Sequence, residues 1–371
     1  MIRGAKGLYH LLEAIVANIW FGFPGRSLTV IGVTGTDGKT TTTTLIYEIL
    51  KAAGKNVSMI TSVAAVIAGK SYDTGFHVTN PRAWWLQKYL REVVDHGDTH
   101  MVLEVTSHGL SQYRVWGIPF AVGVLTNVTH EHLDWHGTME SYTKTKLSLL
   151  KQSKTAIASK IKLPGKKVIA YDKLRFQFQT RLLGEFNRQN CLAAIAAARE
   201  LGVDDAVIQK AIADYAGVPG RLETVVTKPF GVIVDFAHTP NAIEQVLRTV
   251  RPFTKNRLIH VFGSAALRDH SKRPFMGTAS ARYADIIILT EEDYRTEDVD
   301  EIINQIASGM PKEKKVHKIP DRKKAIEFAL SIARPGDLVI LTGKGHEKSL
   351  ARGNKEYPWS DQEAVKEFFK H

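Results

Sequence analysis

The stretch LTVIGVTGTDGKTT occupies residues 28–41 and predicts the passage of a strand into a helix. Its first half, through Thr34, is apolar and rich in β-branched residues, as is typical of a strand inside a sheet. A glycine-rich turn follows, and a helix is expected from about Thr40 to Ala53. A strand, a glycine-rich turn and a helix in this order form the context that a phosphate-binding loop needs.

The segment GTDGKTT predicts a binding site for nucleotide phosphates rather than a mere tight turn. Its glycines allow backbone N–H groups to face the phosphates, and the helix N-terminus adds partial positive charge. Lys39 is expected to reach the β- and γ-phosphates, and Thr40 to offer its hydroxyl to Mg²⁺. The match to the general P-loop pattern is imperfect, because its first glycine position holds Val33. The predicted nucleotide contacts are Gly35, Thr36, Gly38, Lys39, Thr40 and Thr41.

The composition is that of an ordinary globular protein with room for two domains. The chain has 371 residues, of which 44% are hydrophobic and 24% are charged. Its single cysteine, Cys191, excludes an internal disulfide or a Cys-rich metal site and favours a reducing, cytoplasmic setting. The net charge of +12 favours anionic partners such as nucleotides and acidic peptides. No nucleic-acid-binding motif is present, so we expect no nucleic-acid partner, and we expect a monomer.

Two successive series of strands and helices predict an α/β fold. Residues 28–217 are expected to form a P-loop central domain with a mostly parallel sheet, and residues 218–371 a C-terminal Rossmann-like domain. A turn at residues 217–221 marks the junction. Further strands are expected at residues 57–61, 101–105, 122–126, 168–171, 231–235, 258–262, 285–290 and 337–342. Further helices are expected at residues 190–200, 241–250, 274–282 and 322–333.

Residues 1–27 are expected to form an amphipathic helix and a linker, ending near the glycines at residues 22–25. No apolar run in the sequence is long enough to span a bilayer, and the order of segments in a signal peptide is missing. We expect the helix to pack on the following domain, and contact with a membrane surface is the alternative. Helical spacing is followed by Leu8, Leu11, Leu12, Ile15, Val16 and Ile19.

The loop, read as Gly-Thr-x-Gly-Lys-Thr, resembles that of the Mur ligase family and its folylpolyglutamate synthetase relatives. Other segments resemble the family's in the same order: EVTSH (104–108), TNVTHEHLDWHGTM (126–139), YTKTK (142–146), GEFNRQN (184–190), GRLE (220–223), VDFAHTP (234–240) and GKGHE (343–347). DFAHTP and GKGHE point to the branch that adds the third residue to UDP-MurNAc-dipeptide. The resemblance implies an ATP- and Mg²⁺-dependent ligase that joins an amino acid to a peptide carboxylate through an acyl phosphate, in peptidoglycan precursor synthesis.

The resemblance also implies a metal site. Glu104 and His132 would hold Mg²⁺ together with Thr40, and a carboxylate is a good ligand for a hard cation. Lys146 sits where the family has a carbamylated lysine, which as an anion could support a second metal ion. The neighbouring Lys144 leaves this assignment ambiguous. The implied catalytic residues are Lys39, Lys146 and His238.

For the rest of the nucleotide, the resemblance places Asn187 and Asn190 near the adenine, although Asn190 could equally be a helix cap. Arg221 would face the ATP phosphates, and Asp235 would accept hydrogen bonds from the ribose hydroxyls. His238 would lie near the nucleotide or the acyl phosphate.

The incoming amino acid carries a carboxylate and an ammonium group. Arg268 and Arg295 suit the carboxylate, since guanidinium binds it bidentately, and Glu347 suits the ammonium. The family's diaminopimelate-specific members carry DNPR where residues 292–295 here read EDYR, so diaminopimelate, lysine and other amino acids stay open. The acceptor is expected to contact Thr79 and Asn80.

The beginning of the chain departs from the family pattern. Usual members have a whole domain before the P-loop that grips UDP, whereas here only one helix is expected before that strand. Two alternatives therefore stand beside the peptidoglycan role. One is a Mur-like ligase acting on a non-UDP peptide or γ-glutamyl acceptor, as in folylpolyglutamate or cyanophycin-type chemistry. The other is a non-catalytic nucleotide-binding regulator, against which the intact set of Lys39, Glu104, His132 and Asp235 argues.

Overall fold

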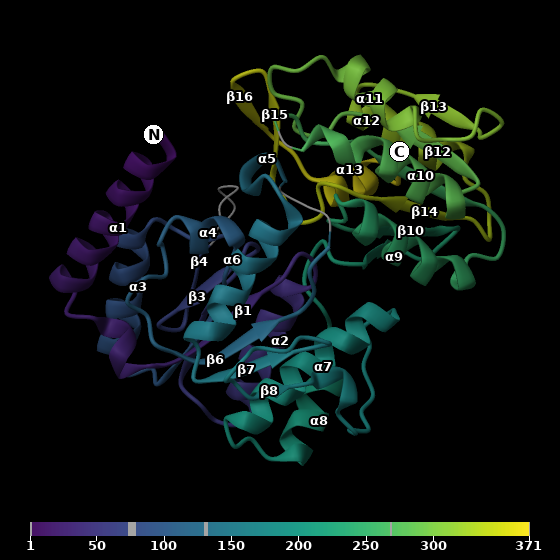
Figure 1. The fold of residues 1–371 in the computed structure, drawn as a ribbon. Coiled ribbons are helices and arrows are strands. Elements are labelled where there is room, and N and C mark those ends of the chain that lie inside the picture. The colour runs from purple at the N-terminus through teal and green to yellow at the C-terminus, as the bar shows by residue number, and fades with distance from the viewer. Residues whose placement is uncertain (1, 73–78, 130–132, 268, 371) are drawn as a thin grey trace. The chain divides into compact units, whose positions relative to one another are not determined.

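The computed structural model describes residues 2–72, 79–129, 133–267 and 269–370, and the chain divides into two compact units (Figure 1). Unit 1 comprises Met1–Thr129 and His136–Ala216, and unit 2 comprises Gly217–His371 with the short segment His130–Trp135. The four-residue helix α5 (Leu133–His136) spans the boundary between the segment His130–Trp135 of unit 2 and the part of unit 1 that begins at His136.

An eight-stranded sheet forms the centre of unit 1. Its strands are β1 (Thr29–Thr34), β2 (Val57–Ile60), β3 (Ala65–Ile67), β4 (Lys70–Tyr72), β5 (His100–Glu104), β6 (Phe120–Leu125), β7 (Thr155–Ala158) and β8 (Val168–Ile169). They lie in the order β4-β3-β2-β5-β1-β6-β7-β8. The pairs from β2 to β8 are parallel, whereas β3 and β4 add an antiparallel edge. The carboxyl ends of β5, β1 and β6 therefore lie side by side at one edge, where parallel sheets commonly bind ligands.

Helices cover this sheet and bury its central strands on both faces. They are α1 (Ile2–Trp20), α2 (Lys39–Ala52), α3 (Ala83–Asp95), α4 (Ser107–Ser111), α6 (Met139–Gln152), α7 (Glu185–Glu200) and α8 (Asp205–Asp214), with short turns η1 (Pro24–Ser27) and η2 (Tyr171–Lys173). Helices α3 and α6 share one core cluster with Val30 of β1. Ile31 and Val33 point the other way by strand alternation and are equally buried. Helix α2 contacts α7 and α8.

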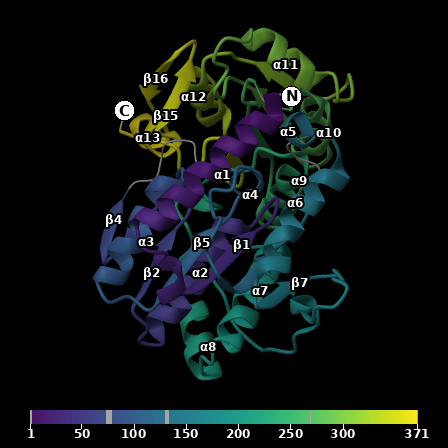
Figure 2. The same cartoon turned by 60° about the vertical axis from the view of Figure 1, so that its left-hand side comes forward.

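Helix α1 lies alongside α3 in both views of the molecule (Figures 1 and 2). The expectation that the first helix packs on the following domain is therefore correct for one of its sides. No helix within the described part of the chain has both the length and the apolar character that crossing a membrane would require.

Unit 2 contains a second, six-stranded sheet. Its strands are β9 (Glu223–Val226), β10 (Gly231–Val234), β11 (Leu258–Phe262), β12 (Ile286–Leu289), β13 (Val316–Lys318) and β14 (Leu338–Leu341), and β15 (Ser349–Arg352) and β16 (Lys355–Pro358) form a separate hairpin. The order is β13-β12-β11-β14-β10-β9, parallel except for β9. The helices are α9 (Pro240–Val250), α10 (Arg273–Tyr283), α11 (Val299–Ala307), α12 (Arg322–Ile332) and α13 (Asp361–Phe368), with turns η3 (Arg251–Phe253) and η4 (His270–Lys272).

The two mostly parallel sheets confirm the predicted α/β fold class. Each expected strand is present, most of them one or two residues shorter than predicted. The helix expected at residues 190–200 begins earlier, at Glu185. Short elements such as β3, β4 and the β15–β16 hairpin were not predicted, because three or four residues carry too little periodicity.

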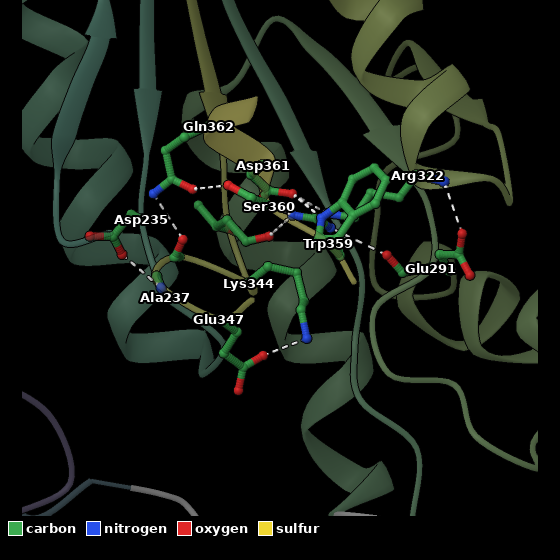
Figure 3. A network of polar contacts seen from close by, with 12 residues as sticks. Asp235, Ala237, Glu291, Arg322, Lys344, Glu347, Trp359, Ser360, Asp361 and Gln362 are labelled. Atoms are coloured by element: carbon green, nitrogen blue, oxygen red, sulfur yellow. Dashed lines mark hydrogen bonds and ion pairs between the residues drawn. The ribbon is translucent and has the colours of Figure 1, made fainter. Parts of the chain in front are cut away.

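A buried ion pair joins four elements of unit 2 (Figure 3). Arg322, at the start of α12, is fully buried and donates to both carboxylate oxygens of Asp361 at 2.8 and 2.6 Å. The same guanidinium donates to the carbonyl oxygens of Thr342 and Glu291, which follow β14 and β12. The indole N–H of Trp359 also donates to Asp361. The network therefore holds the ends of two strands against the beginnings of α12 and α13.

We expect Arg322→Met to destabilise unit 2 strongly, because it leaves the Asp361 carboxylate buried without its cation. The expected loss in the free energy of unfolding is about 3–5 kcal/mol. Lys323→Met is the matched control, since the Lys323–Glu367 pair is half exposed and contributes roughly 0–1 kcal/mol. Urea unfolding followed by tryptophan fluorescence measures both, and equal small losses would contradict the proposed importance of the buried pair.

Candidate functional site

The loop between β1 and α2 is closely enclosed by neighbouring segments. Gly35 and Gly38 have φ values of 153° and 79°, where side chains are rarely tolerated. A Cβ atom at Gly35 would lie 1.8 Å from the Thr126 hydroxyl oxygen, and one at Gly38 would lie 2.3 Å from the Asn190 side-chain oxygen. Both positions therefore require glycine on conformational and steric grounds.

The segment after β6 holds the backbone of this loop. The Thr126 hydroxyl donates to the carbonyl oxygen of Asp37 at 2.6 Å. The Asn127 side chain donates to the same carbonyl and accepts from the Asp37 N–H, each at 3.0 Å. From the sequence, Thr126 and Asn127 were only part of a segment that resembles the family's. The structure shows that their side chains fix the conformation of this glycine-rich loop.

The predicted loop residues surround the N-terminus of α2. The Lys39 ammonium donates to the carbonyl oxygen of Thr36 at 2.7 Å, so it lies over the loop itself. The Thr36 hydroxyl accepts from the backbone N–H of Thr129 at 3.0 Å and lies 3.1 Å from the hydroxyl of Tyr142. Thr41 is buried in the first turn of α2. A lysine ammonium beside a helix N-terminus is suited to bind an anion such as a phosphate group.

Three oxygen-bearing side chains converge beside this helix start. Glu104 ends β5, is only 2% exposed and accepts from the Thr40 hydroxyl at 2.9 Å. It also accepts from the backbone N–H of Ser62 at 3.0 Å, and the hydroxyls of Ser62 and Thr40 lie 2.9 Å apart. Ser62 was not predicted to take part, since nothing in its local sequence marks it.

The cluster of Thr40, Ser62 and Glu104 offers hard oxygen donors, which Mg²⁺ prefers. A Mg²⁺ ion bound with substrate phosphates commonly uses only one or two carboxylates, so this donor set fits it. The described residues contain no group of three or more His, Cys, Asp or Glu side chains arranged to hold a metal. His132, the other predicted ligand, lies outside the described residues.

Lys146 lies beside the same loop, buried on α6 with 2% of its surface exposed. Its ammonium donates to the carbonyl oxygen of Gly35 at 2.6 Å and lies 4.6 Å from the centre of the Tyr142 ring. Lys144, on the same helix, is exposed. Of the two candidate lysines, the structure therefore places Lys146 at the loop.

Helix α7 supports the loop from another side. The Asn190 amide donates to the side-chain oxygen of Asn187 at 3.1 Å, and Asn187 donates to the carbonyl of Leu183. Asn190 lies in the second turn, and the N-cap is Gly184, so the alternative that Asn190 caps the helix is wrong. The next residue, Cys191, is fully buried, and burial raises the pKa of its thiol to about 11.

The predicted acceptor contacts, Thr79 and Asn80, lie in the turn before α3. Asn80 is almost completely buried, and its amide donates to the carbonyl oxygen of Glu104 at 2.6 Å. Its side-chain oxygen accepts from the N–H and the hydroxyl of Thr106 at 2.8 and 2.9 Å. Asn80 therefore fixes the chain that follows β5.

In unit 2, one group of predicted residues follows β10. The Asp235 carboxylate accepts from the backbone N–H groups of Leu222 and Ala237 at 2.7 and 2.6 Å, the latter drawn in Figure 3. The Arg221 guanidinium lies 4.3 Å from the centre of the Phe236 ring, and His238 contacts the same ring edge-on. Asp235 therefore orders the backbone that carries Arg221 and His238.

A second group lies after β12 and β14, around a buried lysine (Figure 3). Lys344 is fully buried, and its ammonium lies 2.8 Å from the carboxylate of Asp293. It also lies 2.5 Å from the carboxylate of Glu347, and this second ion pair is drawn in Figure 3. Burial alone would lower its pKa, but Glu347 and Asp293 hold the pKa of Lys344 above its ordinary value. Lys344 is therefore a cation that fixes the position of Glu347.

Glu292 lies within this group as a buried acid. Burial raises the pKa of Glu292 to about 7. The negative charges of Asp293 and Glu347 also raise this pKa, whereas the positive charges of Lys344 and Arg322 lower it. Its Oε2 atom has no hydrogen-bond partner among the described residues. A Cβ atom at Gly343 would lie 2.5 Å from that oxygen.

Arg295 lies in the segment that follows β12, and its backbone adopts the left-handed conformation, with φ of 48°. Its backbone pairs with the β15 strand, because its N–H donates to Ala351 and its carbonyl accepts from Gly353. The structure gives its guanidinium no acidic partner among the described residues, although several carboxylates lie nearby in the sequence. Arg268, its predicted companion, lies outside the described residues.

Both units of the chain are similar to known proteins of one family. Residues 33–163 match the family model described as Mur ligase middle domain, and residues 220–345 match Mur ligase, glutamate ligase domain. A UDP-N-acetylmuramoyl-L-alanyl-D-glutamate--2,6-diaminopimelate ligase of Aquifex aeolicus (strain VF5) is 38% identical, over 95% of this chain and 79% of that protein. A UDP-N-acetylmuramyl-tripeptide synthetase of Roseiflexus sp. (strain RS-1) is 38% identical, over 94% of this chain and 80% of that protein.

The fold is also similar to that of a Mycobacterium tuberculosis folylpolyglutamate synthase complexed with ADP and AMPPCP. The TM-score is 0.76 at 17% identity, and the match covers 97% of this chain and 95% of that one. At this identity the likeness concerns the fold alone.

The raised pKa of Glu292 predicts a pH-dependent stability. Ionised Glu292 destabilises the folded state, so stability is lost as pH rises from the ordinary value of 4.5 to about 7. Glu292→Gln should therefore stabilise the protein at about pH 8, by up to about 3 kcal/mol, and have little effect at about pH 4. Thermal unfolding at both pH values measures this.

Glu363→Gln is the control for this change, since Glu363 is exposed and forms a surface ion pair with Lys366. The same gain from both variants, or a gain from Glu292→Gln that does not depend on pH, would contradict the assignment.

Proposed function

Since this chain belongs to the Mur ligase family of ATP-dependent, amide-forming ligases, we propose that it adds an amino acid to UDP-MurNAc-L-Ala-D-Glu in peptidoglycan precursor synthesis. The observation that carries the proposal is the cluster of Thr40, Ser62 and Glu104 beside Lys39 at the start of α2. The acceptor follows from the names of the Aquifex and Roseiflexus relatives.

The glycine loop is proposed to bind the ATP phosphates. Gly35, Thr36, Gly38 and Thr41 supply backbone or hydroxyl groups at the N-terminus of α2, and Lys39 neutralises phosphate charge. Asn187 and Asn190 support the loop from α7 and are proposed to lie near the adenine. Arg221 and Asp235 keep their proposed roles toward the phosphates and the ribose.

ATP and a divalent metal ion are implied by the family. Thr40 and Glu104 would hold Mg²⁺, with His132 as a further proposed ligand, and Ser62 orients the Glu104 carboxylate. When bound, Mg²⁺ supplies charge neutralisation at the phosphates. Lys146 is proposed to act as a carbamate, which would convert a buried cation beside Gly35 into an anion near the nucleotide.

The reaction then needs two substitutions. A carboxylate oxygen of the acceptor attacks the γ-phosphorus, and the bond from that phosphorus to the bridging oxygen of ADP breaks. The amino group of the incoming amino acid then attacks the acyl carbon, inorganic phosphate leaves, and the amine loses a proton. Lys39 stabilises charge on the transferred phosphoryl group, and His238 is proposed to lie near it.

For the incoming amino acid, Arg295 and Arg268 are proposed to bind the carboxylate and Glu347 the ammonium group. The Lys344 ion pair holds the Glu347 carboxylate in place, so it needs little reorganisation when the ammonium binds. Thr79 and Asn80 are proposed to lie at the acceptor site. Because the hydrogen bonds of Asn80 hold the end of β5, its effect on the acceptor would be through positioning.

Phosphate release from ATP and Mg²⁺ tests the proposal. The acceptors are UDP-MurNAc-L-Ala-D-Glu and the same dipeptide without UDP, each combined with a panel of single amino acids, and product masses are read in parallel. We expect release only when the UDP acceptor and one amino acid are both present, with a tripeptide mass. Turnover only with the UDP-free acceptor, or ATP binding without turnover, would overturn the proposed substrate or the proposed catalysis.

The loop assignment predicts a specific loss of nucleotide binding in Gly38→Ala. Gly38 and Gly54 share the left-handed conformation, with φ of 79° and 72°, so alanine strains both. Only at Gly38 does the added carbon collide with Asn190, whereas Gly54 has open space. We expect Gly38→Ala to weaken ADP–Mg²⁺ binding by about tenfold or more, measured by calorimetry, and Gly54→Ala to retain it. Equal affinities would argue against a phosphate-binding loop.

A further inference from the structure

Helix α1 presents an unusual face to solvent. Every exposed residue between positions 7 and 20 is apolar or aromatic, each at least 53% exposed. These residues are Leu8, Tyr9, Leu12, Val16, Ile19 and Trp20. They recur three or four positions apart and so form one stripe along the helix. A contiguous apolar stripe of this kind marks an interaction surface.

The polar residues of the same helix face the protein instead. Glu13 has 15% of its side chain exposed and forms an ion pair with Arg82, with Nε 3.0 Å from the carboxylate. Asn18 is buried and donates to the carbonyl oxygens of Ala14 and Trp116 at 2.8 and 3.0 Å. Polar contacts therefore anchor α1 to unit 1 and leave its apolar side outward, the reverse of an ordinary surface helix.

Aromatic contacts also fix the end of the helix. The Trp84 ring at the start of α3 lies 5.9 Å from that of Trp20 and 5.2 Å from that of Phe21. The neighbouring Trp85 is 49% exposed and has the Lys88 ammonium 5.2 Å from its ring centre. The apolar surface thus continues from α1 onto α3, with a cation beside it.

The charges around this surface indicate what covers it. Residues 2–27 and 82–90 contain one acidic residue, Glu13, which Arg82 neutralises. The same ranges contain five basic residues: Arg3, Lys6, Arg26, Arg82 and Lys88. Arg26 and Lys88 are exposed, and the Lys88 ammonium lies 3.8 Å from the carboxylate of Glu92, one turn further along α3. An apolar helix face with tryptophan and tyrosine, bordered by cations and without free carboxylates, matches the chemistry of an anionic lipid surface.

We propose that the outward face of α1 rests on an anionic membrane surface and holds the enzyme there peripherally. Leu8 and Trp20 lie twelve residues apart, so the stripe extends roughly 18 Å along the helix at 1.5 Å per residue. A helix of this length lies in the plane of the interface with its apolar side among the acyl chains, while flanking arginine and lysine side chains meet the headgroups. This membrane contact does not depend on which substrate the ligase uses.

Vesicle flotation of the full chain tests this. We expect the protein to float with vesicles of phosphatidylglycerol and phosphatidylcholine, and weakly or not at all with phosphatidylcholine alone. Binding should weaken as salt concentration rises, because the cationic border is screened. Leu12→Glu/Ile19→Glu should reduce binding to the anionic vesicles by about tenfold or more, because it places two carboxylates in the apolar stripe.

Phe253→Glu/Phe275→Glu is the matched control. These phenylalanines are 65% and 59% exposed on unit 2, so the substitution removes similar surface and adds the same charge elsewhere. We expect this variant to float like the unaltered protein. Both variants should keep ADP–Mg²⁺ affinity and urea unfolding unchanged, since the substituted side chains are exposed.

Three results would overturn the proposal. One is no flotation of the unaltered protein with either vesicle. Another is flotation that Leu12→Glu/Ile19→Glu leaves unchanged. The third is light scattering that shows a dimer in solution which this variant separates into monomers, without any vesicle binding, because the stripe would then be covered by a second copy.

Discussion

The glycine-rich loop between β1 and α2 depends on the hydrogen bonds that Thr126 and Asn127 make to Asp37. Without them, two glycines in positive-φ conformations would leave the chain from β1 to α2 free to adopt many conformations. The carboxyl ends of β5 and β6 flank β1, so Glu104 and Thr126 reach the loop from either side. The parallel order of these three strands thus brings the glycine-rich loop and the Glu104 carboxylate together.

In unit 2, several charged side chains are buried after β12 and β14. Arg322 and Lys344 each neutralise carboxylates and so hold the backbone that carries Glu347 and Arg295. Removing charges from water is costly unless each has partners with good geometry. Glu292 is the least compensated member of this group, which is why burial shifts its pKa so far.

Local features of the sequence sufficed to predict the strand, the glycine-rich turn and the helix that follows it. Gly35, Gly38 and Lys39 follow an apolar strand at a spacing that is typical of phosphate-binding loops, and the order of later family segments indicated the second unit. Ser62 and the supporting role of Asn80 could not be predicted, because their contacts join residues 42 and 24 positions apart from Glu104. Periodicity indicated that the first helix is amphipathic. It could not indicate that Glu13 and Asn18 face inward, since that depends on Arg82 and Trp116.

The buried Cys191 has a practical consequence for observing the molecule. A thiol with a pKa near 11 and no exposed surface reacts with a labelling reagent only after α7 separates from its neighbours. It is the chain's single cysteine and directly follows Asn190, whose side-chain oxygen lies against Gly38. The rate of thiol modification therefore measures how often α7 moves away from the glycine-rich loop. The single native cysteine thus serves as a probe of that motion, without any introduced label.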